Sequence, residues 1–304
     1  MSALSTPARP ALNEADRWPE PFDPECLRGR YGDLAAMSDD QLVDHYARYG
    51  RAEGRIASPA ALREGFIPLA PADASVLEIG PFCQPVMTGP NVRYLDVLDA
   101  AGLRARGEAI GIDTHQTPDV IHFTQGLGEA AGQGFDILFS SHNLEHQPDL
   151  IGHLKEAAAA LAPGGVYMLI VPDRRYCFDH FLPDLTLARV LDAHLEGRVV
   201  HTAQSVIEHR AFTCHNDTLR HWQGDHGPEP DGLDGRVEYA LNELKVAAGS
   251  YVDVHAWQFT PNAFHQIMTR LHALGWSPFR PLRVYDTAYG RNEFTAVLTM
   301  NGGG

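Results

Sequence analysis

Short apolar runs alternate with amphipathic segments through the middle of the chain. Apolar runs with strand character lie at residues 75–80, 92–96, 118–124, 135–141 and 166–172. Between the last two, residues 149–162 carry apolar side chains at helical spacing, and Pro163-Gly-Gly165 ends this segment. Strands that alternate with helices in this way predict a parallel sheet with helices on both faces.

The same pattern returns near the C-terminus. Thr260-Pro261 is a typical helix start, with a capping hydroxyl before a first-turn proline, and further strands are predicted at residues 280–286 and 294–300. We therefore expect an α/β, doubly wound, Rossmann-like fold with a seven-stranded, mostly parallel sheet. Only residues 81–91 join the first two strands, and prolines and a glycine interrupt them. An irregular or one-turn connection is expected there, because a full crossover helix does not fit.

The limits of the alternating region predict the domain organisation. Residues 1–70 are expected to form an N-terminal extension with a short helix, which Ser38-Asp-Asp-Gln41 would begin as a capping box. Residues 71–304 would form the main domain. Within it, residues 174–250 interrupt the alternation with polar, histidine-rich sequence. We expect this helical or irregular insertion to cover the substrate.

Composition narrows the class of protein. The 304 residues are 44% hydrophobic, which suffices for a substantial core. The formal net charge is −15, and protonation of all 16 histidines would bring it only to about +1, which disfavours nucleic-acid binding. The four cysteines are widely spaced, and neither a signal peptide nor a long apolar window is recognisable. We expect a cytoplasmic protein without membrane partners; its oligomeric state stays open.

The first strand ends in a glycine turn and the second ends in an acid. Glu78-Ile-Gly80 is followed by Phe82 and Gln84, bulky residues where a pyrophosphate-binding turn would need bare backbone. Asp96 lies 16 residues after Gly80 and suits the hydroxyls of a ribose; its alternative role is to cap a loop. A nucleoside cofactor without phosphate fits this pattern, and we expect S-adenosyl-L-methionine.

These motifs together give the chain a family resemblance. Residues 76–172 resemble the class I S-adenosylmethionine-dependent methyltransferases, in the bacterial type-11-like group with an E-x-G motif and an S-H-x-x-E-H motif, here Ser141-His-Asn-Leu-Glu-His146. The usual second and third glycines of the first motif are missing. The resemblance implies the following cofactor contacts: Glu78, Gly80 and Pro81 on the methionine and ribose side, Asp96 at the ribose, Phe123 and Thr124 near adenine, and Ser141 and His142 facing the transferred methyl group.

Three side chains are candidates for the base that would deprotonate an acceptor. His142 and Asp173 follow the predicted fourth and fifth strands, at the edge where open α/β sheets bind ligands, and His226 belongs to the densest histidine cluster of the insertion. A purely structural role is the alternative for each. The predicted substrate-binding residues are Arg174, Arg175, Tyr176, His180, Trp222 and His255. No metal is expected, because the histidine spacing is not diagnostic of a metal site.

We interpret the chain as a transferase that methylates a small-molecule or glycan-related acceptor, with oxygen as the expected acceptor atom. The link to glycans rests on residues 38–55, which resemble a segment of bacterial polysaccharide-biosynthesis proteins. Two alternatives stay open. The same cofactor supports aminocarboxypropyl transfer or cyclisation with release of methylthioadenosine, and a non-catalytic nucleoside-binding scaffold would also use this fold.

Overall fold

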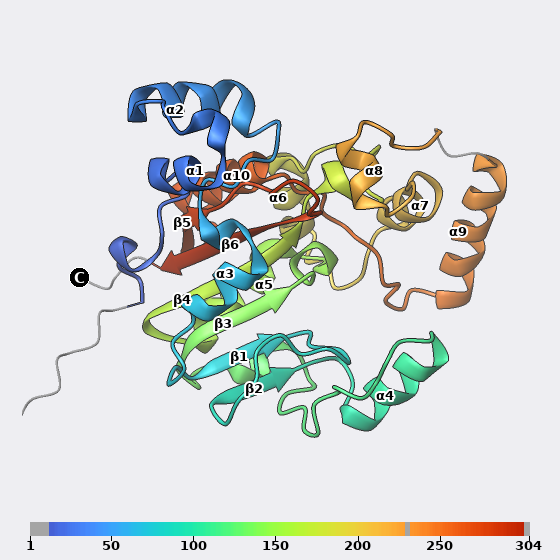
Figure 1. Cartoon of the computed structure of the whole chain (residues 1–304). Helices are drawn as coiled ribbons and strands as arrows, with labels where there is room; N and C mark the ends of the chain where they lie inside the picture. Colours follow the sequence, from blue (N-terminus) through green and yellow to red (C-terminus); the bar gives the residue numbers. More distant parts are fainter. Residues whose placement is uncertain (1–11, 229–231, 301–304) are drawn as a thin grey trace, which may run out of the picture.

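The computed structural model describes residues 12–228 and 232–300 (Figure 1). Its strands are β1 (Val76–Ile79), β2 (Val92–Leu95), β3 (Phe135–Ser141), β4 (Leu161–Pro172), β5 (Phe279–Val284) and β6 (Glu293–Met300). Its α-helices are α1 (Pro24–Arg30), α2 (Asp39–His45), α3 (Arg63–Phe66), α4 (Ala100–Ala109), α5 (Leu150–Ala160), α6 (Leu187–Leu195), α7 (Ala203–Ala211), α8 (Thr218–Trp222), α9 (Leu233–Ala247) and α10 (Pro261–Ala273).

Short 3-10 and π turns connect several of these elements. They are η1 (Ala15–Arg17), η2 (Gly32–Leu34), the π turn η3 (Tyr46–Gly50), η4 (Pro59–Ala61), η5 (Ile67–Leu69), η6 (Leu127–Ala130), η7 (Leu144–His146) and η8 (Arg174–Tyr176). Two of them, η6 and η7, follow the sheet edge at which the functional residues gather.

The strands form one mixed, mostly parallel sheet in the order β2-β1-β3-β4-β6-β5. β1 pairs in parallel with β2 and β3, β3 pairs in parallel with β4, and β6 runs antiparallel between β4 and β5. The predicted α/β class and mostly parallel sheet are thus confirmed. The chain passes from β1 outward to β2 on one side and from β3 to β4 on the other. The switch point that favours ligand binding therefore lies between β1 and β3.

The predicted count of seven strands is wrong for the described residues, which form six. Residues 118–124 run beside β2, but only a single bridge joins Phe123 to Leu95. One reason is that Nδ1 of His122 accepts the amide N–H of Tyr94 at 3.1 Å. A further strand at this edge of the sheet would need that amide for a backbone hydrogen bond. The segment thus follows the sheet without extending it.

Most other predicted elements are confirmed. Residues 81–91 form an irregular connection without a helix. Asp149 caps α5 by accepting the amide of Gly152, and Thr260 caps α10 by accepting the amide of Ala263. β4 begins at Leu161, earlier than expected, and a register shift between β3 and β4 accommodates its first residues.

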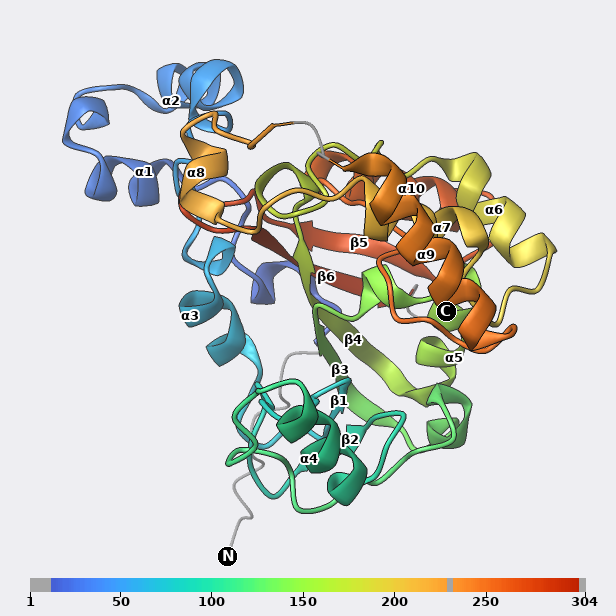
Figure 2. The ribbon, with the colours of Figure 1, turned by 90° about the vertical axis from the view of Figure 1, so that its right-hand side faces the viewer.

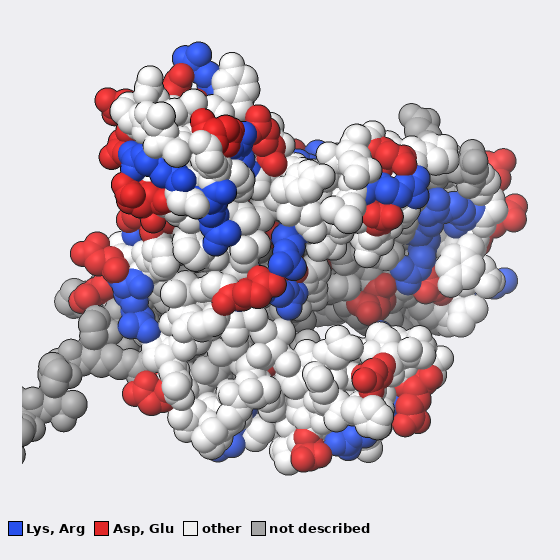
Figure 3. Space-filling view, viewed as in Figure 1, with Lys and Arg blue, Asp and Glu red and all other residues white. Residues whose placement is uncertain are grey.

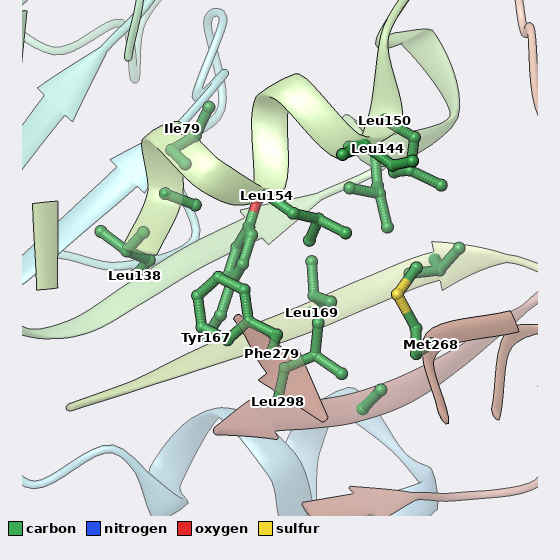
Figure 4. Close-up of a cluster of buried hydrophobic side chains, with 14 of the residues drawn as sticks. Ile79, Leu138, Leu144, Leu150, Leu154, Tyr167, Leu169, Met268, Phe279 and Leu298 are labelled. Carbon is green, nitrogen blue, oxygen red and sulfur yellow. The ribbon is translucent and has the colours of Figure 1, made fainter. Parts of the chain in front are cut away.

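Different segments cover the two faces of the sheet. In Figure 2 the sheet is seen nearly edge on, with α3 on one side and α5, α6 and α10 on the other. Leu154 of α5 and Met268 of α10 pack over Tyr167, Leu169 and neighbouring strand residues in one core (Figure 4). The hydroxyl of Tyr167 is satisfied there by Ser140 and His153, each at 3.0 Å. This core fixes the strand ends that carry the site.

The N-terminal extension supplies the cover of the other face. Trp18, Phe66 and Ala60 pack on β-strand residues including Ile137 and Met168. Besides α2, whose Ser38–Gln41 capping box is present, the extension contains α1 and α3, while residues 1–11 lie outside the described part. Residues 174–250, the predicted insertion, contain α6, α7, α8 and α9. Of the helices within the described ranges, none has the length and apolar character needed to cross a membrane.

Candidate active site

Two adjoining cavities lie at the carboxyl ends of β1, β2 and β3. Their volumes are about 380 and 470 Å³. Both are lined by Gly80, Asp96, Val97, Asn143, Gln147 and Pro148. Figure 3 shows the molecule hollowed between the part that carries α4 and the part that carries α7 and α9. Because the cavities share one wall at the switch point of the sheet, we treat them as two ends of one cleft.

Gly80 brings the end of β1 close to the segment after β3. Its φ of 73° lies in the left-handed region that glycine tolerates. A Cβ atom at this position would lie 2.6 Å from Nδ2 of Asn143, and the Asn143 side chain is itself fixed by a 2.9 Å hydrogen bond from Gln147. Backbone conformation and close approach therefore both require glycine here.

Replacing Gly80 by alanine is expected to destabilise the fold and to displace Asn143 from the cleft. Gly132 offers a matched control, because its φ is 76° and a Cβ atom added there would meet no other atom within 4 Å. Gly132→Ala should lower the free energy of unfolding by about 1–2 kcal/mol, and Gly80→Ala by roughly 1–3 kcal/mol more. Urea denaturation of both variants measures the difference; equal losses would mean that the approach to Asn143 costs nothing.

Glu78 holds the connection between β1 and β2 rather than lining the cleft. Its side chain is buried, and its two oxygens accept the amide N–H groups of Val86 and Met87, each at 2.8 Å. Burial raises the pKa of Glu78 to about 7, and the two amides oppose that shift only in part. The predicted cofactor contact of Glu78 is therefore indirect in this structure, through the loop that it holds.

Glu78 predicts a pH dependence of stability. Its pKa in the folded protein lies above the ordinary value of 4.5, so its stabilising contribution is fully present below pH 4.5 and is lost as the pH rises through about 7. The difference in unfolding free energy between the wild type and Glu78→Gln should shrink by about 3 kcal/mol from about pH 4 to pH 8. Denaturation at a series of pH values tests this. A difference that grows with pH would mean that the two amides keep Glu78 ionised.

Asp96 lies at the end of β2 and faces both cavities. One side-chain oxygen accepts the amide of Phe82 at 3.1 Å and the other accepts the amide of Val97 at 2.7 Å. Burial raises the pKa of Asp96 above its ordinary value. Asp96 thus caps the loop, which was its alternative role, and at the same time presents free lone pairs to the cleft.

The larger cavity extends along η6 and the start of α5. Leu95, Gly126 and Leu127 line it together with Gly152 and His153. Phe123 and Thr124, the predicted adenine contacts, are not among its lining residues. Phe123 meets the ring of Phe135 edge on at 6.3 Å, and the amide of Thr124 donates to Glu129. Residues 126–127, slightly later in the sequence, line this cavity instead.

His142 lines the smaller cavity in an unusual backbone conformation. Its φ is 49°, and its Nε2 lies 2.8 Å from Oε2 of Glu293. Arg63 donates to both oxygens of Glu293, at 2.6 and 2.9 Å, and to the hydroxyl of Ser141 at 2.7 Å. Burial alone would raise the pKa of Glu293, but the hydrogen bonds of His142 and Arg63 outweigh it and hold this pKa at about 2. Ser141 and the buried Pro81 are not among the lining residues.

A second wall of the smaller cavity comes from α4 and the segment after α9. It includes Arg106, Ile110, Tyr251 and Asp253. Asp253 links α4 to η7, because its side-chain oxygens lie 3.1 Å from Nη2 of Arg106 and 2.9 Å from Nδ1 of His146. The close contact with His146 lowers the pKa of Asp253 well below its ordinary value, although burial opposes the shift. This ion-pair chain closes the cleft across segments that are distant in sequence.

Behind this wall lies a buried acid and histidine cluster. Glu145 is 0% exposed, and its Oε1 lies 3.8 Å from Nε2 of His146 and 3.8 Å from Nε2 of His255. Nδ1 of His255 is 2.6 Å from Oδ2 of Asp179. Burial lowers the pKa of His255 to about 3. In the described part of the chain, three groups have ligand atoms close enough to hold a metal ion: Glu145–His146–His255, Asp179–His209–His255 and His180–His221–His226.

The predicted set of bases is not assembled in one place. Asp173 is fully buried, where Arg175 pairs with both its oxygens and Thr287 donates to one of them at 2.6 Å. Its acceptor capacity is thus largely used within the fold. His226 stacks on His180 at 3.6 Å in the histidine-rich insertion. Neither Asp173 nor His226 lines either cavity, whereas His142 does.

The predicted substrate residues are also dispersed. Arg174 pairs with Asp184 and donates to the carbonyl of His180 at 2.9 Å, and Tyr176 stacks on Trp222 at 3.7 Å. None of the six predicted substrate residues lines the two cavities; His255 packs edge on against His146, which lines the smaller one, with ring centroids 4.6 Å apart. The sequence shows that these residues are polar or aromatic. It does not show which way the chain of the insertion turns, and so it does not show which of them face the cleft.

Several residues that line the cleft were not predicted from the sequence. Asn143 and Gln147 lie within or next to the Ser141–His146 motif, so the motif itself was a signal for them. Arg106, Tyr251 and Asp253 carried no comparable signal, because α4 and the segment after α9 meet only in the folded chain.

One comparison with known proteins identifies a family. A family model described as "Methyltransferase domain" matches residues 51–227, more than half of the chain. No curated protein gives a significant match.

Solved structures with similarity to the chain include a DhpI–SAH complex, at 15% identity over 95% of this chain and 97% of that chain, with a TM-score of 0.37. A SAM-dependent methyltransferase from Aquifex aeolicus is 12% identical over 87% of this chain and 100% of that one, with a TM-score of 0.39. The mitomycin 7-O-methyltransferase MmcR is 14% identical over 95% and 66%, with a TM-score of 0.37.

Proposed function

The chain belongs to the methyltransferase-domain family, and on that premise we propose that it uses S-adenosylmethionine as its methyl donor and methylates a hydroxyl group of a small-molecule or glycan-related acceptor, with His142 as the general base. The observation that carries this proposal is the pair of His142 and Glu293 at the edge of the smaller cavity. The membership in a family of enzymes argues against the scaffold alternative.

The residues of the cleft suit the donor. Asp96 keeps lone pairs for the two ribose hydroxyls beside the amides that it already accepts. Gly80 leaves the backbone bare next to Asn143, where the methionine end would pass, and Leu95 and Leu127 offer apolar surface for adenine in the larger cavity. When bound, the donor supplies an electrophilic methyl group on a sulfonium.

The base assignment rests on how His142 is held. Glu293 at Nε2 keeps a proton on that nitrogen, so the lone pair of Nδ1, which lies 3.9 Å from Oε1 of Glu145 and beyond hydrogen-bond distance of it, can take a proton from an acceptor hydroxyl. Arg63 keeps Glu293 in place and ionised. Alignment of the acceptor oxygen with the methyl group would contribute most to the rate, and the proton transfer to His142 would add to it.

The proposed acceptor class draws on three polar side chains beside His142, in a cavity whose wall is otherwise mainly apolar. Gln147, Tyr251 and Asp253 offer hydrogen-bond donors and acceptors around the smaller cavity, a lining that suits a molecule rich in hydroxyl groups. The two cavities, about 380 and 470 Å³, fall in the range of small-molecule sites. The glycan-related class draws in addition on the sequence of residues 38–55.

Product analysis tests the proposed reaction. The purified chain is incubated with S-adenosylmethionine and a fractionated extract of small molecules and glycan precursors, and nucleoside products are quantified by mass spectrometry. We expect S-adenosylhomocysteine above the enzyme-free control, with a mass gain of one methylene on an oxygen of the acceptor. Methylthioadenosine instead would support aminocarboxypropyl chemistry, and methylation at nitrogen would contradict the acceptor atom.

A further inference from the structure

Glu145 is a buried carboxyl group that lacks the partners such a group needs. It lies in η7 and is 0% exposed. Within residues 12–228 and 232–300, neither side-chain oxygen has a hydrogen-bond partner. A carboxyl group removed from water without compensation is strongly disfavoured, and buried carboxyl groups are normally hydrogen-bonded, paired or bound to a metal. The position of Glu145 therefore calls for a ligand.

Histidine nitrogens surround the free oxygen of Glu145. Oε1 lies 3.8 Å from Nε2 of His146, 3.8 Å from Nε2 of His255 and 3.9 Å from Nδ1 of His142. These separations are too long for hydrogen bonds. In a tetrahedral zinc site with bonds of about 2.1 Å, ligand atoms lie about 3.4 Å from one another. The spacing of the cluster is thus close to that of atoms that share an ion.

A carboxyl group contacts the far nitrogen of each histidine, through a hydrogen bond at His255 and through an ion-pair contact at His146. Nδ1 of His146 lies 2.9 Å from Asp253, and Nδ1 of His255 lies 2.6 Å from Asp179. Each of these contacts directs the other ring nitrogen, Nε2, toward Glu145. Metal-binding histidines characteristically have such a carboxylate partner, which fixes the ring orientation.

The other two groups are less suited to an ion, because several of their histidine nitrogens already have partners. Nδ1 of His221 bonds to Nδ1 of His226 at 3.0 Å, and Nε2 of His221 bonds to the carbonyl of His215 at 3.0 Å. In the group around Asp179, Nδ1 of His209 accepts the amide of His255 at 3.1 Å. The observations thus favour the Glu145 group.

We propose that Glu145, His146 and His255 bind one divalent transition-metal ion, of which zinc is the reference case. Imidazole and carboxylate are the ligand types that such ions take, and three protein ligands leave a coordination position open. The ligand atoms all lie within 4.8 Å of one another. His146 also lines the smaller cavity, so the site adjoins the cleft. The proposal departs from the expectation, drawn from sequence, that no metal is bound.

Cobalt titration of the full chain tests the site without any methyl donor or acceptor, so its outcome is independent of the proposed reaction. The protein is stripped with a chelator, dialysed and titrated with Co²⁺, whose visible absorption reports nitrogen and oxygen ligands; Zn²⁺ is then added in competition. We expect saturation at one equivalent and displacement by Zn²⁺. Absence of stoichiometric binding would overturn the proposal.

Variants locate the ion. Glu145→Gln keeps the shape of the side chain, and His146→Gln changes a residue at the cavity wall; each should weaken Co²⁺ binding at least 100-fold. Asp179→Asn, which changes the partner of His255 and also a member of the Asp179–His209–His255 group, should weaken it about 10- to 100-fold. His226→Gln, in the separate histidine group, is the matched control and should bind Co²⁺ as the wild type does.

Circular dichroism of each metal-free variant monitors folding, and if Glu145→Gln does not fold, His146→Gln decides. Unchanged affinity in Glu145→Gln or His146→Gln, or a loss confined to His226→Gln, would contradict the assignment.

Discussion

Replacing Asp96 by alanine is expected to weaken the binding of S-adenosylmethionine about 100-fold. Charge-assisted hydrogen bonds to ribose hydroxyls are worth about 1.5–3 kcal/mol each, and a loss of about 3 kcal/mol corresponds to roughly 100-fold in Kd. The substitution also releases the amide of Phe82, which Asp96 holds at 3.1 Å, and so loosens the loop beside the cofactor. Isothermal titration calorimetry with the donor measures the change without an acceptor.

Two further variants separate recognition from loop support. Asp96→Asn keeps an oxygen that accepts the amide of Phe82 but removes the charge, and we expect it to weaken binding about 10-fold, consistent with the loss of one charge-assisted bond. Asp119→Ala removes an exposed acid that pairs only with the exposed Arg104 at 3.1 Å and should leave the affinity unchanged. Wild-type affinity in Asp96→Ala would assign ribose binding to other groups.

Replacing His142 by asparagine is expected to lower kcat about 1,000-fold, since general-base catalysis contributes roughly 10²–10⁴-fold. Asparagine tolerates the left-handed backbone that His142 adopts at a φ of 49°, so the substitution removes the base with little strain. Affinity for S-adenosylmethionine should stay within about twofold of the wild type, because the ribose contact at Asp96 is retained. Single-turnover measurements with the acceptor found by product analysis report the chemical step.

Glu293→Gln distinguishes a base from a merely structural histidine. Glu293 acts through His142, so its substitution should lower kcat by about 10-fold while leaving KM for the donor unchanged. If the two residues work as one unit, the double variant should be no slower than His142→Asn alone. Wild-type kcat in His142→Asn would assign proton removal to another group in the cleft.

Much of the fold was predictable because local rules fix it. The apolar runs at residues 76–79 and 135–141 become buried parallel strands, and the side chains of Asp149 and Thr260 cap the helices that they precede. The prediction that failed, a strand at residues 118–124, failed because the ring of His122 takes the amide of Tyr94. A periodicity argument does not include such competition between side chain and backbone.

The candidate site was predictable only where its residues end a strand. Gly80, Asp96 and His142 line the cleft because the carboxyl ends of parallel strands share one edge of the sheet. Asp173 also ends a strand, but the fold surrounds it with Arg175 and Thr287. Strand position alone therefore identifies the edge of the sheet and does not decide which side chains stay free.

The sequence by itself determined most of the elements, the glycine turn after β1 and the acid after β2, because these depend on contacts between near neighbours. Only the tertiary structure decided which distant groups meet: Glu293 with His142 across 151 residues, Asp179 with His255 across 76, and Arg106 with Asp253 across 147. Packing of the insertion and the last strand against the sheet creates these pairs. The charge and free lone pairs of each residue in the cleft depend on them, because electrostatic interactions act through space between groups that folding brings together.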